Sequence, residues 1–200
     1  MSYKVLILPV LIFVAFGSGA LCQAADPDPN FHLFLCFGQS NMDGQAEPEA
    51  VDQSVDPRFQ MMAAVDFPAL NRKKGNWYPA TPPLVRSYTH LCPVDYFGRT
   101  LVANLPANAR VGVILVAVSG CRIELFDKDQ YHAQVVNKPD WMMGILKEYD
   151  NNPYQRLVEI ARLAQKDGVI NGILIHQGES NTGDREWPAK VKKVWRSRTE

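Results

Sequence analysis

The chain has 200 residues, and its 21 basic and 21 acidic side chains give a formal net charge of zero at neutral pH. This balance provides no electrostatic attraction to nucleic acid or to an anionic membrane, and it fits a neutral substrate best. A chain of this length forms one domain that buries about 70% of the surface exposed when unfolded, so the fold needs no disulfide framework.

The first 24 residues have the pattern of a secretory signal peptide. An apolar run over residues 5–16 follows one lysine, and small residues lead to Ala24. The run is too short to cross a bilayer, and Leu21 stands where a lipoprotein signal needs a small residue before its cysteine. We therefore expect cleavage after Ala24, a secreted or periplasmic domain over residues 25–200, and no stable membrane association.

Three cysteines remain after this cleavage, namely Cys36, Cys92 and Cys121. An odd number allows at most one disulfide within a single chain. Cys36 lies inside an apolar run, where it is expected to behave as a small buried hydrophobic residue. The pattern leaves open whether Cys92 and Cys121 are bonded to each other.

Three apolar runs predict strands at residues 32–37, 111–118 and 169–175, the first of them preceded by a polar, proline-broken leader at residues 26–30. Nearly continuous apolar runs are typical of strands that are covered on both faces of a parallel sheet. The three strands are spread along the chain, which leaves room between them for crossover connections.

Helical patterns fill the intervals between these strands. Residues 93–105 carry apolar side chains at fourfold spacing after a proline suited to a first helical turn. A second helix is predicted from Pro153 until Gly168 stops it. Alternating strands and helices indicate right-handed crossovers, and we predict an α/β fold, a three-layer α/β/α sandwich with a parallel sheet.

The segment from Glu47 to Tyr88 has no clear periodicity and is rich in Pro, Asp, Asn and Lys. Excursions of about forty residues of this kind carry function or are disordered. Its aromatic residues and prolines suggest an ordered wall beside a site, and a decorated surface loop is the equally weighted alternative.

Ser40 follows the end of the first predicted strand, between Gly38 and Gly44. A serine in a tight strand-to-helix turn exposes its hydroxyl and directs its backbone N–H at a developing oxyanion. Met42 stands where a Gly-x-Ser-x-Gly elbow would have its second glycine, which argues against an α/β-hydrolase lipase. The alternative is that Ser40 only caps the following helix.

Two further strand ends carry candidate site residues. Gly120 follows the second strand, and its backbone N–H could approach a ligand closely, although a simple turn glycine has the same signature. After the third strand, Gln177 can donate two amide hydrogens and Glu179 can accept a proton or orient a histidine. His176 alternates with Gln177, so the two side chains should point to opposite faces, and Asn181 is interpreted as a turn former.

Three strings together carry a family resemblance. They are Gly-Gln-Ser-Asn-Met-x-Gly at residues 38–44, Val-Ala-Val-Ser-Gly-Cys-x-Ile at 116–123, and His-Gln-Gly-Glu-Ser-Asn at 176–181. In this order they resemble the sialate O-acetylesterase-like family of the SGNH hydrolase superfamily, which includes acetylxylan esterases. The resemblance runs from about Phe31 to Trp187.

The resemblance implies a flavodoxin-like fold and a role for each motif. Ser40 would be the nucleophile, the oxyanion hole would comprise the N–H groups of Ser40 and Gly120 with the Gln177 side chain, and Glu179 would be the acid partner of a catalytic histidine. It implies a secreted serine esterase that removes O-acetyl groups from carbohydrate, of the acetylxylan or sialate type, through an acyl-serine intermediate. No metal or other cofactor is implied, and the acetylated carbohydrate is the implied partner.

The family places its catalytic histidine in an Asp-x-x-His motif near the C-terminus, whereas no histidine follows His176 in this sequence. We interpret Asp129 and His132, which have that spacing, as a coincidence because they precede the third motif. We therefore expect a C-terminally truncated or frameshifted domain that is weakly active or inactive. A non-catalytic carbohydrate-binding remnant and a related arylesterase are the alternatives.

Overall fold

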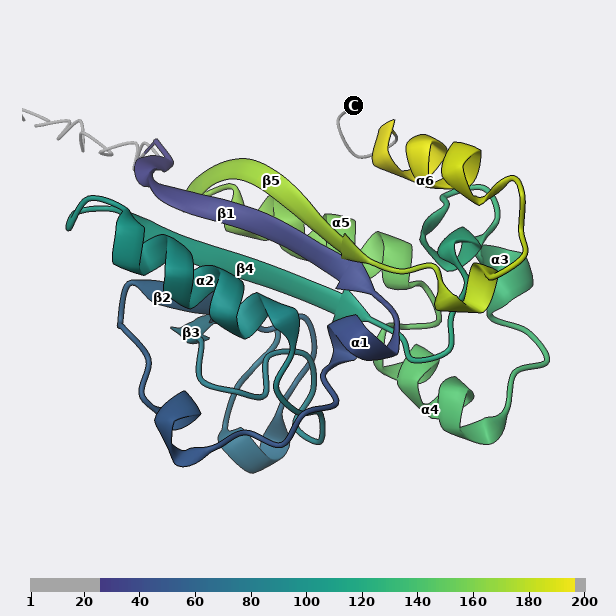
Figure 1. The fold of residues 1–200 in the computed structure, drawn as a ribbon, viewed down its shortest axis with the longest axis horizontal. Helices are drawn as coiled ribbons and strands as arrows, with labels where there is room; N and C mark the ends of the chain where they lie inside the picture. The colour runs from purple at the N-terminus through teal and green to yellow at the C-terminus, as the bar shows by residue number, and fades with distance from the viewer. Residues whose placement is uncertain (1–25, 197–200) are drawn as a thin grey trace, which may run out of the picture.

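The computed structural model describes residues 26–196, and its centre is a five-stranded sheet (Figure 1). The strands are β1 (Asp28–Gly38), β2 (Phe59–Met62), β3 (Trp77–Pro79), β4 (Arg110–Ala117) and β5 (Gly168–His176). The α-helices are α1 (Ser40–Asp43), α2 (Pro93–Asn104), α3 (Tyr131–Gln134), α4 (Asp140–Glu148), α5 (Pro153–Ala164) and α6 (Trp187–Arg196). Short 3-10 helices are η1 (Ala50–Gln53), η2 (Pro68–Leu70), η3 (Ile123–Phe126) and η4 (Glu179–Asn181).

The sheet has the order β3-β2-β4-β1-β5, in which β2, β4, β1 and β5 are parallel and β3 is antiparallel to β2. At the end of β1, Gly38 pairs with Ala117 of β4 and with His176 of β5. The carboxyl ends of three neighbouring strands are therefore level with one another. In open parallel sheets this edge is where ligands bind.

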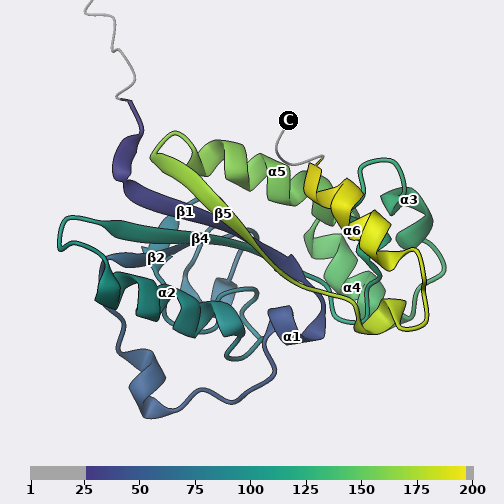
Figure 2. The ribbon, with the colours of Figure 1, turned by 45° about the horizontal axis from the view of Figure 1, so that its top comes forward.

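Helices cover both faces of the sheet, which confirms the predicted three-layer α/β/α architecture. Figure 2 shows α2 on one face of the sheet and α5 on the other. Residues of β4 after Arg110 are all buried, because this strand lies between the two helical layers. Such burial on both faces explains the continuous apolar runs of parallel strands.

The predicted strands and helices correspond closely to β1, β4, β5, α2 and α5. Two boundaries are wrong. β1 begins at Asp28, inside the predicted polar leader, because the N–H of Asp28 donates to the carbonyl of Asp167 at 3.1 Å. The helix α5 ends at Ala164 with Gln165 as its C-cap, so Gly168 is not its stop but the first residue of β5. The signal peptide predicted over residues 1–24 lies outside the described residues. Within residues 26–196, no helix is both long and apolar enough to span a membrane.

The aperiodic segment from Glu47 to Tyr88 is ordered and adds β2 and β3 to the sheet. These strands have four and three residues, which is too short for a periodic pattern to be recognised. Burial of Phe59, Met61 and Met62 nevertheless joins the segment to the core. The surface-loop alternative is therefore wrong for this part of the chain.

The three cysteines of the described chain are free thiols, and all are buried. Cys36 is fully buried in β1, as predicted, and burial raises its pKa well above the ordinary range. Cys121 lies at the carboxyl edge of the sheet, where its Sγ is 3.7 Å from the carbonyl of Gly38. Cys92 instead precedes α2 and takes part in its N-terminal capping box, so Cys92 and Cys121 are not bonded to each other.

Candidate active site

Ser40 is the first residue of α1, two residues after β1 ends at Gly38. The N-cap position belongs to Gln39, which makes no side-chain cap hydrogen bond, so the interpretation of Ser40 as a helix cap is wrong. The backbone carbonyl of Ser40 accepts from the Gly44 N–H at 3.1 Å and from Gln45 Nε2 at 3.2 Å. This half-buried serine therefore lies in the tight strand-to-helix turn that its sequence predicts.

The two neighbours of Ser40 hold the third motif (residues 176–181) against the first motif (residues 38–44). The buried side-chain oxygen of Gln39 accepts hydrogen bonds from the backbone N–H of Ser180 at 3.2 Å and of Gly178 at 3.5 Å. On the other side of Ser40, Asn41 Nδ2 donates to Glu179 Oε1 at 2.6 Å. The loop after β5 is thus fixed beside Ser40 by hydrogen bonds from both flanks.

The second motif (residues 116–123) lies beside Ser40 through the turn that follows β4. The N–H of Val118 donates to the carbonyl of Gly38 at 3.1 Å, and the hydroxyl of Ser119 donates to Asp43 Oδ2 at 2.7 Å. Gly120 follows with φ of 72°, a left-handed conformation that strongly favours glycine. The structure therefore brings all three motifs together at the carboxyl edge of the sheet.

A buried arginine supports the turn that contains Ser40. Arg86, which is 1% exposed, pairs with Asp43 and also donates to the carbonyl of Ala117 at 2.7 Å and to the hydroxyl of Tyr149 at 2.9 Å. Burial raises the pKa of Asp43, although the Arg86 guanidinium and the Ser119 hydroxyl counteract this shift. A buried carboxylate needs such a partner, because an unpaired charge in this place would be costly.

Gln177 is buried, and its amide is bound to the protein on all sides. Its Nε2 donates to Asn181 Oδ1 at 2.9 Å and to the carbonyl of Cys121 at 3.2 Å, while its Oε1 accepts from Trp187 Nε1 at 3.1 Å. In this arrangement the side chain links the second and third motifs. Its role as an oxyanion donor remains a prediction, since donation to a substrate requires one amide hydrogen to leave a protein acceptor.

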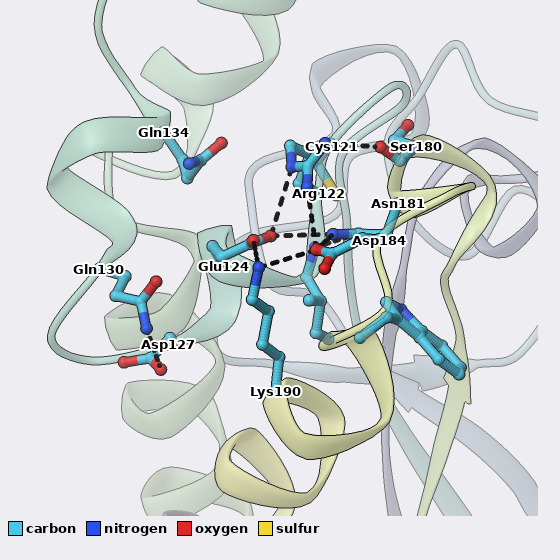
Figure 3. Close-up of polar contacts among 12 residues, drawn as sticks. Cys121, Arg122, Glu124, Asp127, Gln130, Gln134, Ser180, Asn181, Asp184 and Lys190 are labelled. Atoms are coloured by element: carbon cyan, nitrogen blue, oxygen red, sulfur yellow. Dashed lines mark hydrogen bonds and ion pairs between the residues drawn. The ribbon is translucent and has the colours of Figure 1, made fainter.

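Asn181 organises the polar network behind Gln177, shown in Figure 3. Its Oδ1 also accepts from the Ile123 N–H at 2.9 Å, and its Nδ2 donates to Glu124 Oε2 at 3.1 Å. Lys190 of α6 bridges Glu124 at 2.8 Å and Asp184 at 2.7 Å. Burial opposes ionisation of Glu124, but the hydrogen bonds from Lys190 and Asn181 outweigh it and hold its pKa below the ordinary value.

His176 is exposed whereas Gln177 is buried, so the predicted opposite orientation of these neighbours is confirmed. The Nδ1 of His176 lies 3.6 Å from Glu179 Oε1, and both side chains are about half exposed. Residues 175–179 line an open hollow of about 380 Å³ beside them. Its volume is within the range of small-molecule sites, roughly 300 to 1,000 Å³.

The hydroxyl of Ser40 has no hydrogen-bond partner among residues 26–196, so no general base is engaged with it there. Asp129 pairs with Lys193 of α6 at 3.0 Å, and the ring of His132 stacks on Tyr131 with centroids 3.8 Å apart. Asp129 is thus held beside α6, and His132 is a residue of α3, which both views draw well away from α1 (Figures 1 and 2).

Sequence reasoning predicted Ser40, Gly120, Gln177 and Glu179 as site residues, which stays a prediction, but missed the residues that hold them in place. Gln39 and Asn41 stand inside the first motif, and their polar side chains beside a candidate nucleophile were a usable signal. Asn181 does lie in a tight bend, as the last residue of the 3-10 helix η4, but its burial and its side-chain bonds to four residues give it a larger part. The sequence around Arg86 does not predict its role in supporting the site, because its partners lie far away in the sequence.

Comparison with known proteins gives one family and several structural relatives, two of which follow. The family of carbohydrate esterases described as sialic acid-specific acetylesterases matches residues 30–197. A protein from Arabidopsis thaliana has a TM-score of 0.59 at 17% identity, over 85% of this chain and 68% of its own length. The protein NanS has a TM-score of 0.58 at 18% identity, over 86% of this chain and 62% of its own length. At these identities the structural likeness concerns the fold.

Proposed function

The chain belongs to the carbohydrate esterase family of sialic acid-specific acetylesterases, and from this premise we propose that it is a serine esterase which removes O-acetyl groups from carbohydrate. The observation that carries the proposal is the convergence of three motifs on Ser40, held by Gln39, Asn41 and Asp43. Acetylated sialic acid and acetylated xylan are the proposed substrates. We further propose that the domain acts after secretion, in the medium or the periplasm.

In the proposed reaction the Ser40 oxygen attacks the acetyl carbonyl and its proton passes to a histidine base. The N–H groups of Ser40 and Gly120 stabilise the negative oxygen of the tetrahedral intermediate, with Gln177 as the third donor. The sugar hydroxyl then leaves with the proton, and an acetyl-serine remains. Water attacks this ester, acetate is released and Ser40 regains its hydrogen.

Glu179 is proposed to orient the histidine base. Its carboxylate lies beside Ser40 because Asn41 Nδ2 donates to it, and it is half exposed, so one oxygen remains accessible to an approaching imidazole. A carboxylate in this place favours the imidazolium that forms when the base takes the serine proton. The proposal leaves the histidine itself unassigned among residues 26–196.

The test combines acetate release with labelling of the nucleophile. The chain is incubated with acetylated sialic acid, acetylated xylan and an aryl acetate, and a serine-directed phosphonate is used to label the active serine for mass spectrometry. We expect the label on Ser40, and Ser40→Ala should abolish both label and acetate release. Ser54→Ala is the matched control, because Ser54 is exposed and outside the site. Release of acetate that survives Ser40→Ala would refute the mechanism.

One observation favours a second candidate, a carbohydrate-binding protein without catalysis. The Ser40 hydroxyl has no base bound to it among the described residues, and a serine without a base is a poor nucleophile at neutral pH. Binding of acetylated sugar with neither acetate release nor phosphonate labelling would establish this candidate. Release from the aryl acetate alone would instead indicate an arylesterase.

A further inference from the structure

Trp141 is a large aromatic residue that the fold leaves in solvent. It is the second residue of α4, and 54% of its surface is exposed. The same helix is attached to the core through Met142, Ile145 and Leu146, which are all buried. Packing of α4 therefore does not require the indole, so the exposed face of the ring is available to a ligand.

The indole lies against the second motif. A Cβ atom added to Gly120 would come within 3.0 Å of Trp141 Cη2, so the six-membered ring of the indole covers this glycine. The turn that contains Gly120 is in turn bound to Gly38 and to Asp43 of the Ser40 helix. The exposed ring of Trp141 therefore forms part of the rim of the candidate active site.

The helix surface beside Trp141 is open. Gly144 is three residues further along α4 and thus on the same side of the helix. A Cβ atom added there would meet no atom within 4 Å among the described residues. A ring-shaped ligand could consequently reach the indole without displacing a side chain.

We infer that Trp141 is the stacking platform for the sugar ring of an O-acetylated carbohydrate. The C–H groups on one side of a pyranose make a weakly polar face, and such faces pack on aromatic rings because both surfaces leave water together. A ring seated on Trp141 lies next to Gly120, where the acetyl carbonyl has to be held. The inference rests on the proposed function and adds the residue that recognises the sugar.

Binding is measured by calorimetry and by NMR with acetylated sialic acid and with acetylated xylobiose as probes. All proteins carry Ser40→Ala so that the probes are not consumed. We expect Trp141→Ala to weaken binding about tenfold and Trp141→Phe, which keeps a smaller ring, to weaken it about threefold. The matched control is Trp195→Ala, because Trp195 is 43% exposed on α6 and lies outside the site. Its affinity should equal that of the parent.

The NMR spectrum provides a readout that a loss of packing would not reproduce. The indole N–H of Trp141 should shift on addition of either sugar in the parent protein, while that of Trp195 should not. Equal affinity of Trp141→Ala and the parent, or no binding of either sugar at millimolar concentrations, would overturn the inference. Binding that depends on Trp141 without acetate release by the unmodified chain would uphold the inference and refute the esterase proposal. Acetate release by the unmodified chain that does not depend on Trp141 would uphold the esterase proposal and refute the inference about Trp141.

Discussion

The hydroxyl of Ser119 donates a hydrogen bond to the carboxylate of Asp43 at 2.7 Å. Ser119 directly precedes Gly120, and Asp43 is the last residue of the short helix that Ser40 begins. Together with the bond from the Val118 N–H to the Gly38 carbonyl, this hydrogen bond therefore ties together the two turns whose N–H groups the proposed oxyanion hole uses. Oxyanion stabilisation depends on donors that are in place before the charge develops.

Removal of this bond should affect catalysis more than binding. We expect Ser119→Ala to lower kcat for acetyl ester hydrolysis about tenfold with little change in KM, because the missing interaction matters most in the transition state. Ser119→Thr keeps the hydroxyl and should restore most of the rate. Steady-state kinetics on an aryl acetate would check this. A rise in KM at constant kcat would show that Ser119 instead shapes the ground-state site.

Arg86 should be essential for stability because its charge is compensated entirely inside the protein. Arg86→Met leaves the buried carboxylate of Asp43 without its cation, and we expect a loss of about 3 to 5 kcal/mol in the free energy of unfolding. The double variant with Asp43→Asn removes the stranded charge and should recover part of this loss. Urea denaturation of the natural protein, the two single variants and the double variant measures the coupling free energy between Arg86 and Asp43. Additive losses in the double variant would mean that the pair does not interact as the structure indicates.

Local sequence pattern was sufficient for the central fold. The apolar run that became β4 is continuous because this strand is buried on both faces, and the second half of β1 is buried in the same way. The same expectation is wrong for β5, which lies at an edge of the sheet and is only partly buried after Gly168. Pro153 together with Asn152 marks the start of α5 in both sequence and structure. The side chain of Asn152 accepts from the Gln155 N–H, as an N-cap residue does. The strands β2 and β3 gave no such signal, because seven residues in two pieces depend on the sheet edge to order them.

The candidate site also has one part that local sequence pattern predicts and another that only the fold brings together. Glycines and a serine at strand ends are visible in sequence because their place in the chain defines their chemistry. The bonds that assemble the site join residues far apart in the sequence, by 76 positions between Asp43 and Ser119 and by 138 between Asn41 and Glu179. No local pattern records such a pairing, and the same holds for Arg86 and its distant partner Tyr149. Only the fold shows that Gln177 is bound to the protein at both ends of its amide.

Gln177 should therefore contribute to both stability and turnover. We expect Gln177→Ala to lower kcat by about 10²- to 10³-fold, the size of one oxyanion donor, and to cost about 1 to 3 kcal/mol in unfolding free energy because Asn181 and Trp187 lose a partner. Gln165→Ala, at the exposed C-terminal end of α5, serves as control for both measurements. Loss of stability with unchanged kcat would show that the amide only links the two motifs.

The final prediction concerns Asp95, whose side chain is completely buried in the first turn of α2. Its Oδ2 accepts from the Cys92 N–H at 2.9 Å, but its Oδ1 has no hydrogen-bond partner. Burial raises the pKa of Asp95 from 3.8 to about 6. The folded protein thus retains this proton at pH values where the unfolded chain has released it.

Because of this difference, the contribution of Asp95 to the free energy of unfolding decreases as the pH rises. Below about pH 3 both states are protonated, and as the pH rises past 6 the unfolded chain ionises first, so the free energy of unfolding falls by about 3 kcal/mol through this one group. Asp95→Asn keeps an oxygen for the Cys92 N–H and carries no charge. The variant should therefore gain about 3 kcal/mol over the natural protein at pH 7.5 and nearly nothing at pH 3. Urea denaturation of both proteins across this range measures the difference, in which the contributions of all other titrating groups cancel. A constant difference between the two proteins at every pH would show that Asp95 titrates normally despite its burial.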